Sequence, residues 1–229
     1  MIPIAAVLID IEGTASPIAF VRDTLFPFAR ARLPALLAER GNEPEVAAEL
    51  AEVACLAPDK PPLDALLAWM DQDAKVTPLK ALQGMVWADG YARGELRGDL
   101  YPDVAPCLER WAAAGVRLFV YSSGSVEAQR LIFGHSVAGD LAPLFTAFFD
   151  TRIGGKRDAS SYDRIAIAIG VPTAELLFLS DMEAELDAAA AAGLRTCQVA
   201  RPQDGTQPVQ SHPTVADFVA VAARFALPE

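Results

Sequence analysis

Two carboxylates, Asp10 and Glu12, stand two residues apart directly after the apolar run 4–9. Because side chains at positions i and i+2 of a strand point to the same face, we expect both carboxylates to lie side by side where a strand ends. Like charges at that separation repel each other unless a cation or a proton intervenes. A carboxylate can also attack phosphorus and form an aspartyl-phosphate. The pair therefore indicates a cation site or a nucleophilic centre.

Further polar groups follow three later apolar runs of the chain. In an open α/β sheet, ligands bind beyond the carboxyl ends of the strands, so these groups are expected at one edge. Hydroxyl groups before a helix and a lysine suit a phosphate, and carboxylates beside a phosphate suit Mg²⁺. The groups are Ser122 to Ser125 after 116–121, Lys156 after 145–150, and Ser180, Asp181 and Glu185 at the end of 176–180.

Each of these signals is weak when taken alone. An isolated Asp-x-Glu usually marks a turn or a helix start, and the serines 122–125 suit a loop with a helix cap. The sequence Gly-Gly-Lys ending at Lys156 lacks the upstream glycine of a Walker A motif. Asp181 suits a helix cap, and Glu185 is either a surface residue or a partner that orients Lys156. Only the ordered set, with one group after each strand, favours phosphoryl-transfer chemistry.

The elements that position these groups alternate between strand and helix. This alternation predicts an α/β fold with a parallel sheet and right-handed connections. The expected strands are 4–9, 116–121, 145–150, 176–180 and 195–200, and the expected helices are 103–114, 126–135, 160–169, 183–192 and 214–225.

Between the first strand and the second, residues 22–94 show helical periodicity with no strand pattern. Gly41-Asn42, the prolines from 58 to 62 and Pro78 divide this stretch into about four helices. We therefore predict an inserted all-helical cap domain over residues 19–98. Residues 1–18 and 99–229 then form the α/β catalytic core.

The composition narrows the class of protein. Of the 229 residues 52% are hydrophobic and 21% charged, which is typical of a globular domain with a sizeable core. The formal net charge of −11 and the absence of a Lys/Arg cluster argue against a nucleic-acid partner. The three cysteines and two histidines match no metal-ligand spacing, and the cysteines are expected to be reduced.

The location of the protein follows from segments that the sequence lacks. The first ten residues show neither a basic region nor a long apolar stretch, so no signal peptide is expected. No apolar run approaches the roughly 20 residues of a membrane span. We therefore expect a cytoplasmic protein with no membrane partner.

The motifs, in this order, resemble those of the haloacid dehalogenase superfamily. Most phosphatases of that superfamily carry Asp at the second carboxylate position, and Glu12 is a narrower signature. Nearly the whole chain closely resembles the enolase-phosphatase (acireductone synthase) family of methionine salvage, with the weakest likeness between about 40 and 80. The segments that carry the likeness are DIEGTASPIAFVRDTLFPFAR, GYARGELRGDLYPDV, VYSSGSVEAQRLIFGHS, FFDTRIGGKRDASSY and FLSDMEAELDAAAAAGL.

This resemblance implies a Rossmann-like parallel sheet core of the haloacid dehalogenase type with a helical cap. It also implies a monomeric, Mg²⁺-dependent enzyme with a small-molecule substrate: the enzyme enolises 2,3-diketo-5-methylthiopentyl-1-phosphate and then hydrolyses the phosphate. Carried over by position, the resemblance implies catalytic roles for Asp10, Glu12 and Lys156, substrate contacts from Ser122, Ser123 and Lys156, and Mg²⁺ ligands in Asp10, Glu12 and Asp181.

The chain departs from the family pattern at two positions beside the motifs. Ala15 stands where a second threonine is expected, and Ser180 stands where threonine is common. Neither change removes a charged group. For the enolisation, which needs a base next to the carbonyl, Glu12 is our candidate.

An apolar methylthio group needs an apolar pocket, which the aromatic and methionine side chains of the cap could supply. The alternative, favoured for most of them, is that they form the core of the cap; Tyr91 is the strongest pocket candidate. The side chains concerned are Trp69, Met70, Met85, Trp87 and Tyr91.

Three other functions compete with this one. The first is a general phosphatase of the same superfamily, which lacks the enolisation step. A haloacid dehalogenase is disfavoured, because it needs neither Mg²⁺ nor a carboxylate at position 12. A catalytically silent anion-binding protein predicts loss of the nucleophile or the lysine, and Asp10 and Lys156 are both present.

Overall fold

The computed structural model describes residues 3–228 and divides the chain into two compact units. The sheet unit comprises Met1–Ala19 and Arg97–Glu229, and the helical unit comprises Phe20–Leu96. The sequence-based division had placed these boundaries at residues 19 and 98. The chain passes from the first unit to the second within the short helix α1, Ile18–Phe20.

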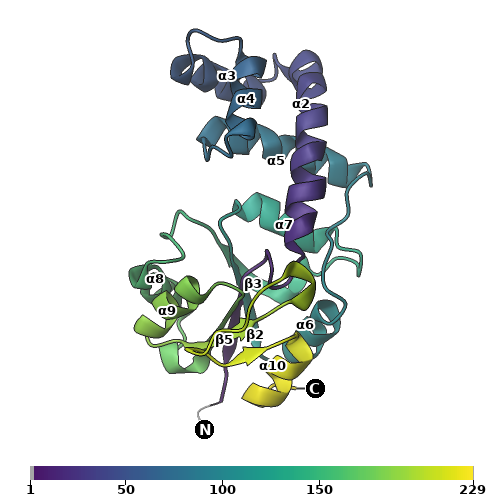
Figure 1. The fold of residues 1–229 in the computed structure, drawn as a ribbon. Helices are drawn as coiled ribbons and strands as arrows, with labels where there is room; N and C mark the ends of the chain where they lie inside the picture. Colours follow the sequence, from purple (N-terminus) through teal and green to yellow (C-terminus); the bar gives the residue numbers. More distant parts are fainter. Residues whose placement is uncertain (1–2, 229) are drawn as a thin grey trace. The chain divides into compact units, whose positions relative to one another are not determined.

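The sheet unit contains a six-stranded sheet in the order β3-β2-β1-β4-β5-β6 (Figure 1). All pairs of neighbouring strands are parallel, which confirms the predicted α/β fold. The chain builds the sheet outward from β1 on one side and then outward on the other, so the order of strands reverses at β1. The strands are β1 Ala6–Ile9, β2 Arg117–Tyr121, β3 Phe145–Phe149, β4 Leu176–Ser180, β5 Arg195–Val199 and β6 Thr214–Val215.

Five helices of the sheet unit connect or follow these strands. Side chains cap three of them, because Ser125, Asp158 and Asp217 accept hydrogen bonds from backbone N–H groups in the first turns of α7, α8 and α10. The helices are α6 Val104–Ala113, α7 Val126–Gly134, α8 Ala159–Ile169, α9 Glu183–Ala191 and α10 Phe218–Phe225; short 3₁₀ turns are η2 Ala142–Leu144, η3 Thr173–Glu175 and η4 Pro202–Asp204.

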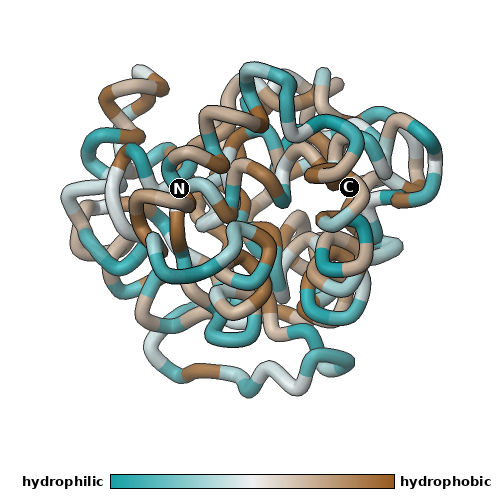
Figure 2. The backbone as a smooth tube through the Cα atoms, turned by 90° about the horizontal axis from the view of Figure 1, so that it is seen from above, coloured by the Kyte–Doolittle hydropathy of each residue, from teal (hydrophilic) through white to brown (hydrophobic). Residues whose placement is uncertain are grey.

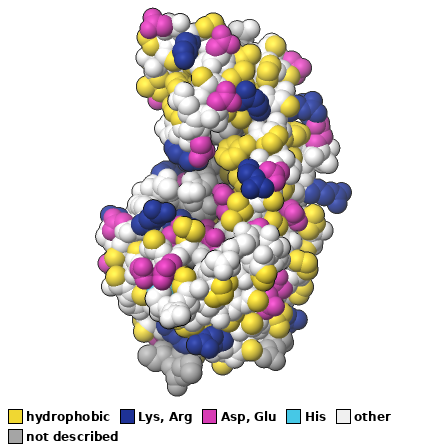
Figure 3. All heavy atoms as spheres, viewed as in Figure 1, with side chains coloured by type: hydrophobic (Ala, Val, Ile, Leu, Met, Phe, Trp, Pro, Cys, Tyr) yellow, Lys and Arg dark blue, Asp and Glu magenta, His cyan; other side chains and the backbone are white. Residues whose placement is uncertain are grey.

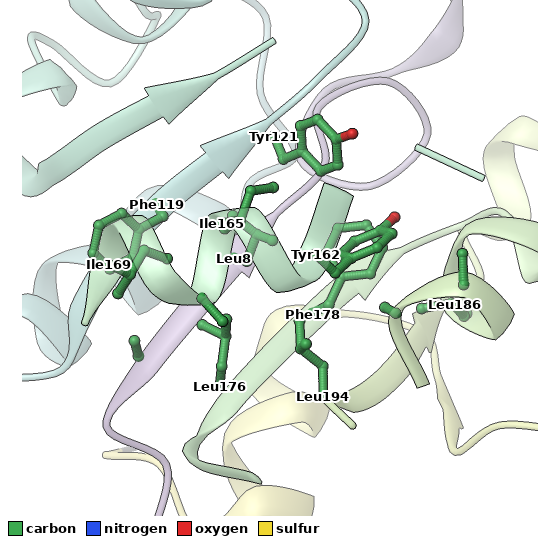
Figure 4. Packing of buried hydrophobic residues seen from close by; sticks show 14 residues of the cluster. Leu8, Phe119, Tyr121, Tyr162, Ile165, Ile169, Leu176, Phe178, Leu186 and Leu194 are labelled. Carbon is green, nitrogen blue, oxygen red and sulfur yellow. The ribbon is translucent and has the colours of Figure 1, made fainter. Parts of the chain in front are cut away.

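Helices cover both faces of the sheet, as expected of parallel strands that are buried on both sides (Figure 1). On one face, Leu8 and Phe178 of the strands pack with Tyr162 of α8 and Leu186 of α9 (Figure 4). Between α6 and α10, Trp111 stacks on Phe218, with ring centroids 5.5 Å apart. The continuously apolar strands of the sequence are thus explained by burial on both faces.

The last predicted helix, residues 214–225, is wrong in its first part. The helix begins at Phe218, and Thr214–Val215 instead forms strand β6 beside β5. The Asp217 side chain accepts a hydrogen bond from the Ala220 N–H at 2.7 Å and so starts the helix there. A strand of two residues is too short to show an alternating pattern, and its residues were therefore read as part of the helix.

The helical unit consists of helices, as predicted for residues 22–94, and the part of it that the structure describes contains no strand. A proline stands at the first or second position of each of its four longer helices, and in the three that follow a non-helical residue its missing N–H costs no hydrogen bond. The helices are α2 Phe26–Arg40, α3 Pro44–Leu56, α4 Pro62–Asp71 and α5 Thr77–Ala92, and a π-helical segment, η1 Val21–Leu25, precedes them.

The helical unit has its own hydrophobic core, to which α2, α3, α4 and α5 each contribute. Four of the five proposed pocket residues, Trp69, Met70, Met85 and Trp87, pack against this core while partly exposed. Trp87 also donates a hydrogen bond from its indole N–H to the Leu25 carbonyl at 2.8 Å. These four side chains therefore serve the packing of the unit, which was the favoured alternative in the sequence analysis.

The distribution of charged and hydrophobic residues agrees with a composition typical of a globular domain. On the face shown in Figure 3, Lys and Arg side chains are interspersed with Asp and Glu. Along the trace in Figure 2, hydrophobic stretches alternate with hydrophilic ones. Among residues 3–228, no helix combines the length and the apolar character needed to cross a bilayer.

Candidate active site

A tight turn follows β1 and carries the first pair of candidate residues; we call residues 10–16 the Asp10 turn. The Asp10 N–H donates to the Leu179 carbonyl of β4 at 2.9 Å, which holds the start of the turn against the sheet. The Ile11 carbonyl then accepts from the N–H groups of three residues, Thr14, Ala15 and Ser16, at 2.8–3.2 Å. The chain therefore folds back on itself immediately beyond the strand.

The two carboxylates of the turn lie in different environments. Strand β1 ends at Ile9, so the alternation that would place Asp10 and Glu12 on one face of a strand does not extend to them. Asp10 is buried, with 4% of its surface exposed, whereas Glu12 is exposed. The turn, and not a continuing strand, therefore determines where each carboxylate points.

Gly13 brings the Asp10 turn close to Asp181, which follows β4. Its φ of +72° lies in the left-handed region that favours glycine. A Cβ atom at this position would meet Oδ2 of Asp181 at 2.6 Å, well inside van der Waals contact. The absence of a side chain at Gly13 thus leaves the space in which the Asp181 carboxylate lies beside the turn.

Lys156 forms the centre of the site. Its Nζ atom lies 2.6 Å from Oδ1 of Asp10 and 2.6 Å from Oε2 of Glu185, and only 10% of its side chain is exposed. Burial by itself lowers the pKa of Lys156, but the charges of Asp10 and Glu185 outweigh it and raise the pKa. Glu185 therefore pairs with Lys156, which was one of the two alternatives that its sequence position allowed.

Ser180, the last residue of β4, links the two carboxylates that Lys156 contacts. Its hydroxyl oxygen lies 2.9 Å from Oε2 of Glu185 and 3.4 Å from Oδ2 of Asp10, and it accepts a hydrogen bond from the Met182 N–H at 3.1 Å. The position where the family commonly has threonine thus keeps a hydroxyl group that contacts the charged cluster.

The cluster carries more negative than positive charge. Burial raises the pKa of Asp181 to about 7, and the charges of Asp10 and Glu185 add to that effect while Lys156 opposes it. Burial also raises the pKa of Glu185, with a further contribution from the charge of Asp10. One buried ammonium among three carboxylates leaves a site that favours an additional cation.

The donor groups of this cluster suit a hard divalent cation. Within residues 3–228, no three or more His, Cys, Asp or Glu side chains are arranged to hold a metal ion by themselves. Mg²⁺, however, is usually bound through one or two carboxylates together with water and substrate phosphate. Asp10 and Asp181 are both buried and close enough for the charge of Asp10 to raise the pKa of Asp181, so they offer such a pair of carboxylates.

The serine loop, residues 122–125, follows β2 at the same edge of the sheet. Ser122 is buried, its N–H donates to the Phe149 carbonyl at 3.2 Å, and its Oγ accepts from the Gly124 N–H at 3.2 Å. Ser123 is exposed. Ser125 caps α7 by accepting from the Ala128 N–H at 3.2 Å. The loop therefore brings hydroxyl groups and the first turn of a helix to the carboxyl end of β2, an arrangement suited to binding an anion.

Three residues that the sequence analysis did not single out support this site. Gln129 donates to the carbonyls of Gly124 and Phe149 at 2.8 and 2.9 Å and so holds the serine loop against β3. Tyr162 donates its hydroxyl hydrogen to the Lys156 carbonyl at 2.7 Å. Tyr121 donates to a carbonyl in the same loop, that of Gly154, at 2.9 Å. Tyrosines within apolar segments were the available signal, since a buried hydroxyl needs a partner.

The structure thus brings Asp10, Lys156, Glu185 and Asp181 into one cluster and places Ser122 and Ser123 at the end of the neighbouring strand. It does not give Glu12 a buried position in that cluster. Tyr91 belongs to the helical unit, where it is 3% exposed and where burial raises the pKa of its phenol.

Comparison with known proteins agrees with this geometry. Residues 4–193 match the family of haloacid dehalogenase-like hydrolases. The chain is 59% identical to an Enolase-phosphatase E1 of Gluconacetobacter diazotrophicus over 98% of this chain and 96% of that protein. It is 57% identical to the Enolase-phosphatase E1 of Acidiphilium cryptum over 97% of this chain and 96% of that one.

A solved structure with a related sequence has the same fold. The UTR4 protein (Unknown transcript 4 protein) of Saccharomyces cerevisiae superposes with a TM-score of 0.81 at 35% identity, covering 94% of this chain and 98% of that chain. The resemblance inferred from the sequence motifs is thereby confirmed. The chain belongs to the haloacid dehalogenase-like hydrolases and, among them, to the Enolase-phosphatase E1 family.

Proposed function

We propose that this protein is a Mg²⁺-dependent enolase-phosphatase of methionine salvage. It converts 2,3-diketo-5-methylthiopentyl-1-phosphate to the acireductone 1,2-dihydroxy-3-keto-5-methylthiopentene and phosphate. The observation that carries the proposal is a buried Asp10 at the point where the strand order reverses, with Lys156 bound to it at 2.6 Å. The relatives named Enolase-phosphatase E1 support both halves of the activity.

Asp10 is the nucleophile of the phosphatase step. Its Oδ1 atom accepts from the Ile11 N–H at 2.7 Å and from Lys156 at 2.6 Å, whereas Oδ2 accepts a long hydrogen bond from the Ser180 hydroxyl at 3.4 Å. Oδ2 therefore keeps lone pairs for attack on phosphorus. The Oδ2–P bond forms as the bond from phosphorus to the substrate oxygen breaks, and water then hydrolyses the aspartyl-phosphate.

Lys156 and the serine loop hold the phosphate during this attack. The ammonium of Lys156 offsets negative charge on both Asp10 and the phosphate, and Glu185 keeps it in place through the 2.6 Å ion pair. Ser122, Ser123 and the first turn of α7 donate hydrogen bonds to phosphate oxygens. The net charge of −11 repels an anionic substrate, so these local donors have to overcome that field.

Mg²⁺, with Asp10, Glu12 and Asp181 as its protein ligands, would supply further positive charge beside the phosphate oxygens and the developing enolate. The buried pair Asp10 and Asp181 fits such an ion. Glu12, exposed on the Asp10 turn, is our candidate for the general base that removes the proton next to the carbonyl.

The helical unit, over residues 19–98, is proposed as the cap domain that the family resemblance implies. The enzyme acts as a monomer in the cytoplasm, a location that suits its three free cysteines, Cys55, Cys107 and Cys197.

The deciding experiment mixes the full chain and Mg²⁺ with the diketone phosphate in the absence of oxygen and follows enol absorbance and free phosphate together. We expect an enol that precedes or accompanies phosphate release. Release of phosphate from unrelated esters, with this diketone untouched, would leave a general phosphatase of the superfamily and overturn the proposal.

Two variants assign the roles within that experiment. Asp10→Asn keeps an oxygen for the Ile11 N–H but is a poor nucleophile, and we expect it to release no phosphate. Glu12→Gln removes the proposed base, and we expect it to stop exchange of solvent deuterium into the substrate. If Glu12→Gln abolishes phosphate release and leaves deuterium exchange intact, Glu12 is not the base.

A further inference from the structure

We infer that Arg201, which follows β5, is a positioning residue for the Asp10 turn. The inference rests on the proposed function insofar as that turn carries the catalytic carboxylates, Asp10 and Glu12. Arg201 lies outside the motifs that indicated the active site, and it contacts the backbone of the turn and not the reacting groups. Its effect on catalysis is therefore expected to pass through the position of the turn.

Arg201 donates two hydrogen bonds to one backbone oxygen of the turn. Its Nε and Nη2 atoms donate to the Thr14 carbonyl at 3.0 and 2.8 Å. The bonds inside the turn hold Thr14 only through its N–H, which donates to the Ile11 carbonyl at 3.2 Å. Arg201 thus links the turn to the far side of the sheet, where β5 and β6 lie.

A single carboxylate holds the guanidinium in this orientation. Nη1 and Nη2 of Arg201 lie 2.8 and 3.0 Å from the two oxygens of Asp103, a bidentate pair. Nη1 also donates to the Ala216 carbonyl at 3.4 Å. These contacts and the two to Thr14 use all five N–H donors of the guanidinium.

Two aromatic rings enclose the plane of the guanidinium. Its Cζ atom lies 4.0 Å from the centre of the Tyr101 ring and 5.4 Å from that of Phe218. The Arg201 side chain is 2% exposed. Both rings are fixed in turn, because Tyr101 donates its hydroxyl hydrogen to Asp204 and the Phe218 N–H donates to Asp103 at 2.8 Å. A lysine could reproduce neither the five-donor pattern nor the stacking.

The Asp204 carboxylate extends the same network to the next residues of the chain. Its Oδ2 atom accepts from the Ile18 N–H at 3.2 Å as well as from the Tyr101 hydroxyl. The Tyr101 N–H donates to the Ala15 carbonyl at 3.1 Å. Contacts from Arg201, Tyr101 and Asp204 therefore secure the backbone from Thr14 to Ile18, directly after the catalytic carboxylates.

The test compares Arg201→Lys and Asp103→Asn with the matched control Trp111→Phe. Trp111 packs on Phe218 in the same region but has no hydrogen bond to the turn, so its change perturbs packing alone. Hydrolysis of p-nitrophenyl phosphate with Mg²⁺ is measured over a range of pH, and backbone hydrogen exchange is measured for the peptides that cover 10–18 and 176–180.

For Arg201→Lys we expect kcat to fall about 10²-fold with KM changed less than about threefold, since a displacement near 1 Å at the reacting groups has that effect. Exchange should rise further in 10–18 than in 176–180, where exchange follows the stability of the whole unit. Asp103→Asn, which keeps a similar shape, should show the same pattern with about a tenfold loss. Trp111→Phe should change neither kcat nor exchange of the turn relative to β4.

Two results would overturn the inference. One is an unchanged kcat and unchanged exchange of 10–18 in Asp103→Asn, which decides the matter even if Arg201→Lys fails to fold. The other is exchange that rises equally in 10–18 and 176–180, since Arg201 then stabilises the whole unit and positions nothing. The exchange experiment needs no substrate, so it stands even if the diketone phosphate proves not to be the substrate.

Discussion

Two buried cations occupy the sheet unit, and their surroundings differ. Arg201 pairs with one carboxylate, that of Asp103, and its remaining donors contact backbone carbonyls. Lys156 contacts two carboxylates, Asp10 and Glu185, at 2.6 Å each, and Asp181 lies near enough for its pKa to respond to that cluster. The first group of charges sums to zero, and the second has an excess of negative charge.

This difference in net charge distinguishes a cluster that supports the structure from a cluster that binds and reacts. A buried ion pair with all its donors used has no capacity for a ligand, and its geometry can only hold other groups in place. A buried cluster with uncompensated carboxylates is unfavourable by itself and gains free energy from a cation or from a polar substrate. The cluster around Lys156 is thus organised for binding and reaction, whereas the cluster around Arg201 is organised to hold the Asp10 turn.

Substitution of Lys156 should have the largest effect on the difference between the two clusters. In Lys156→Met, Asp10 and Glu185 lose their shared partner, so we expect phosphate release to fall on the order of 10³-fold. The free energy of unfolding without Mg²⁺ should fall by about 3 kcal/mol, because buried carboxylates are left unpaired. Steady-state kinetics and urea unfolding at neutral pH measure the two effects.

Lys156→Arg is the control for that change, because it keeps the positive charge but alters the shape of the cation. It should retain most of the stability and still lose most of the activity. A Lys156→Met protein with wild-type stability would contradict the assignment of this lysine as the charge that the buried carboxylates require.

A second pair of substitutions, one in each cluster, should differ in the direction of their effect on the free energy of unfolding. Glu185→Gln removes one of the excess negative charges, so without Mg²⁺ the protein should be as stable as wild type or up to about 1 kcal/mol more stable. Asp103→Asn leaves Arg201 buried without its counter-charge, and it should destabilise the protein by about 3 kcal/mol. Urea unfolding of the two variants side by side measures the difference.

Glu185→Gln and Asp103→Asn should also lower the activity for different reasons. Glu185→Gln loosens Lys156, and we expect about a tenfold fall in kcat through the phosphate-binding step. Equal destabilisation by both substitutions would show that the cluster around Lys156 is electrically balanced, and the distinction between the two clusters would be lost.

Much of this architecture could be predicted from the sequence. The strand 176–180 and the order of strands and helices follow from apolar runs between turn residues, and Lys156 and Asp181 were identified because they follow such runs. The spacing of apolar residues, however, does not predict where side chains point beyond the end of a strand or helix. The relation between Asp10 and Glu12 depends on a turn that begins directly after the last residue of β1, which no strand pattern describes.

Arg201 could not be predicted in the same way. It is one arginine in a loop after a strand, and in a sequence such a residue is expected to be exposed. Its role depends on Asp103, nearly 100 positions earlier in the chain, and on the Thr14 carbonyl, a backbone group that no residue type reveals. Contacts between distant segments through backbone atoms are therefore the part of a site that sequence reasoning misses.

The smallest predicted effect tests the link between Ser180 and the cluster around Lys156. Ser180→Ala removes the hydroxyl that contacts Glu185 at 2.9 Å and Asp10 at 3.4 Å and that accepts from the Met182 N–H. We expect a loss of about 1 kcal/mol in stability and a fall of about threefold in kcat, because Lys156 still holds both carboxylates. Urea unfolding and steady-state hydrolysis of p-nitrophenyl phosphate measure these values. A loss as large as that of Lys156→Met would mean that the serine hydroxyl, and not the ammonium, orients the nucleophile.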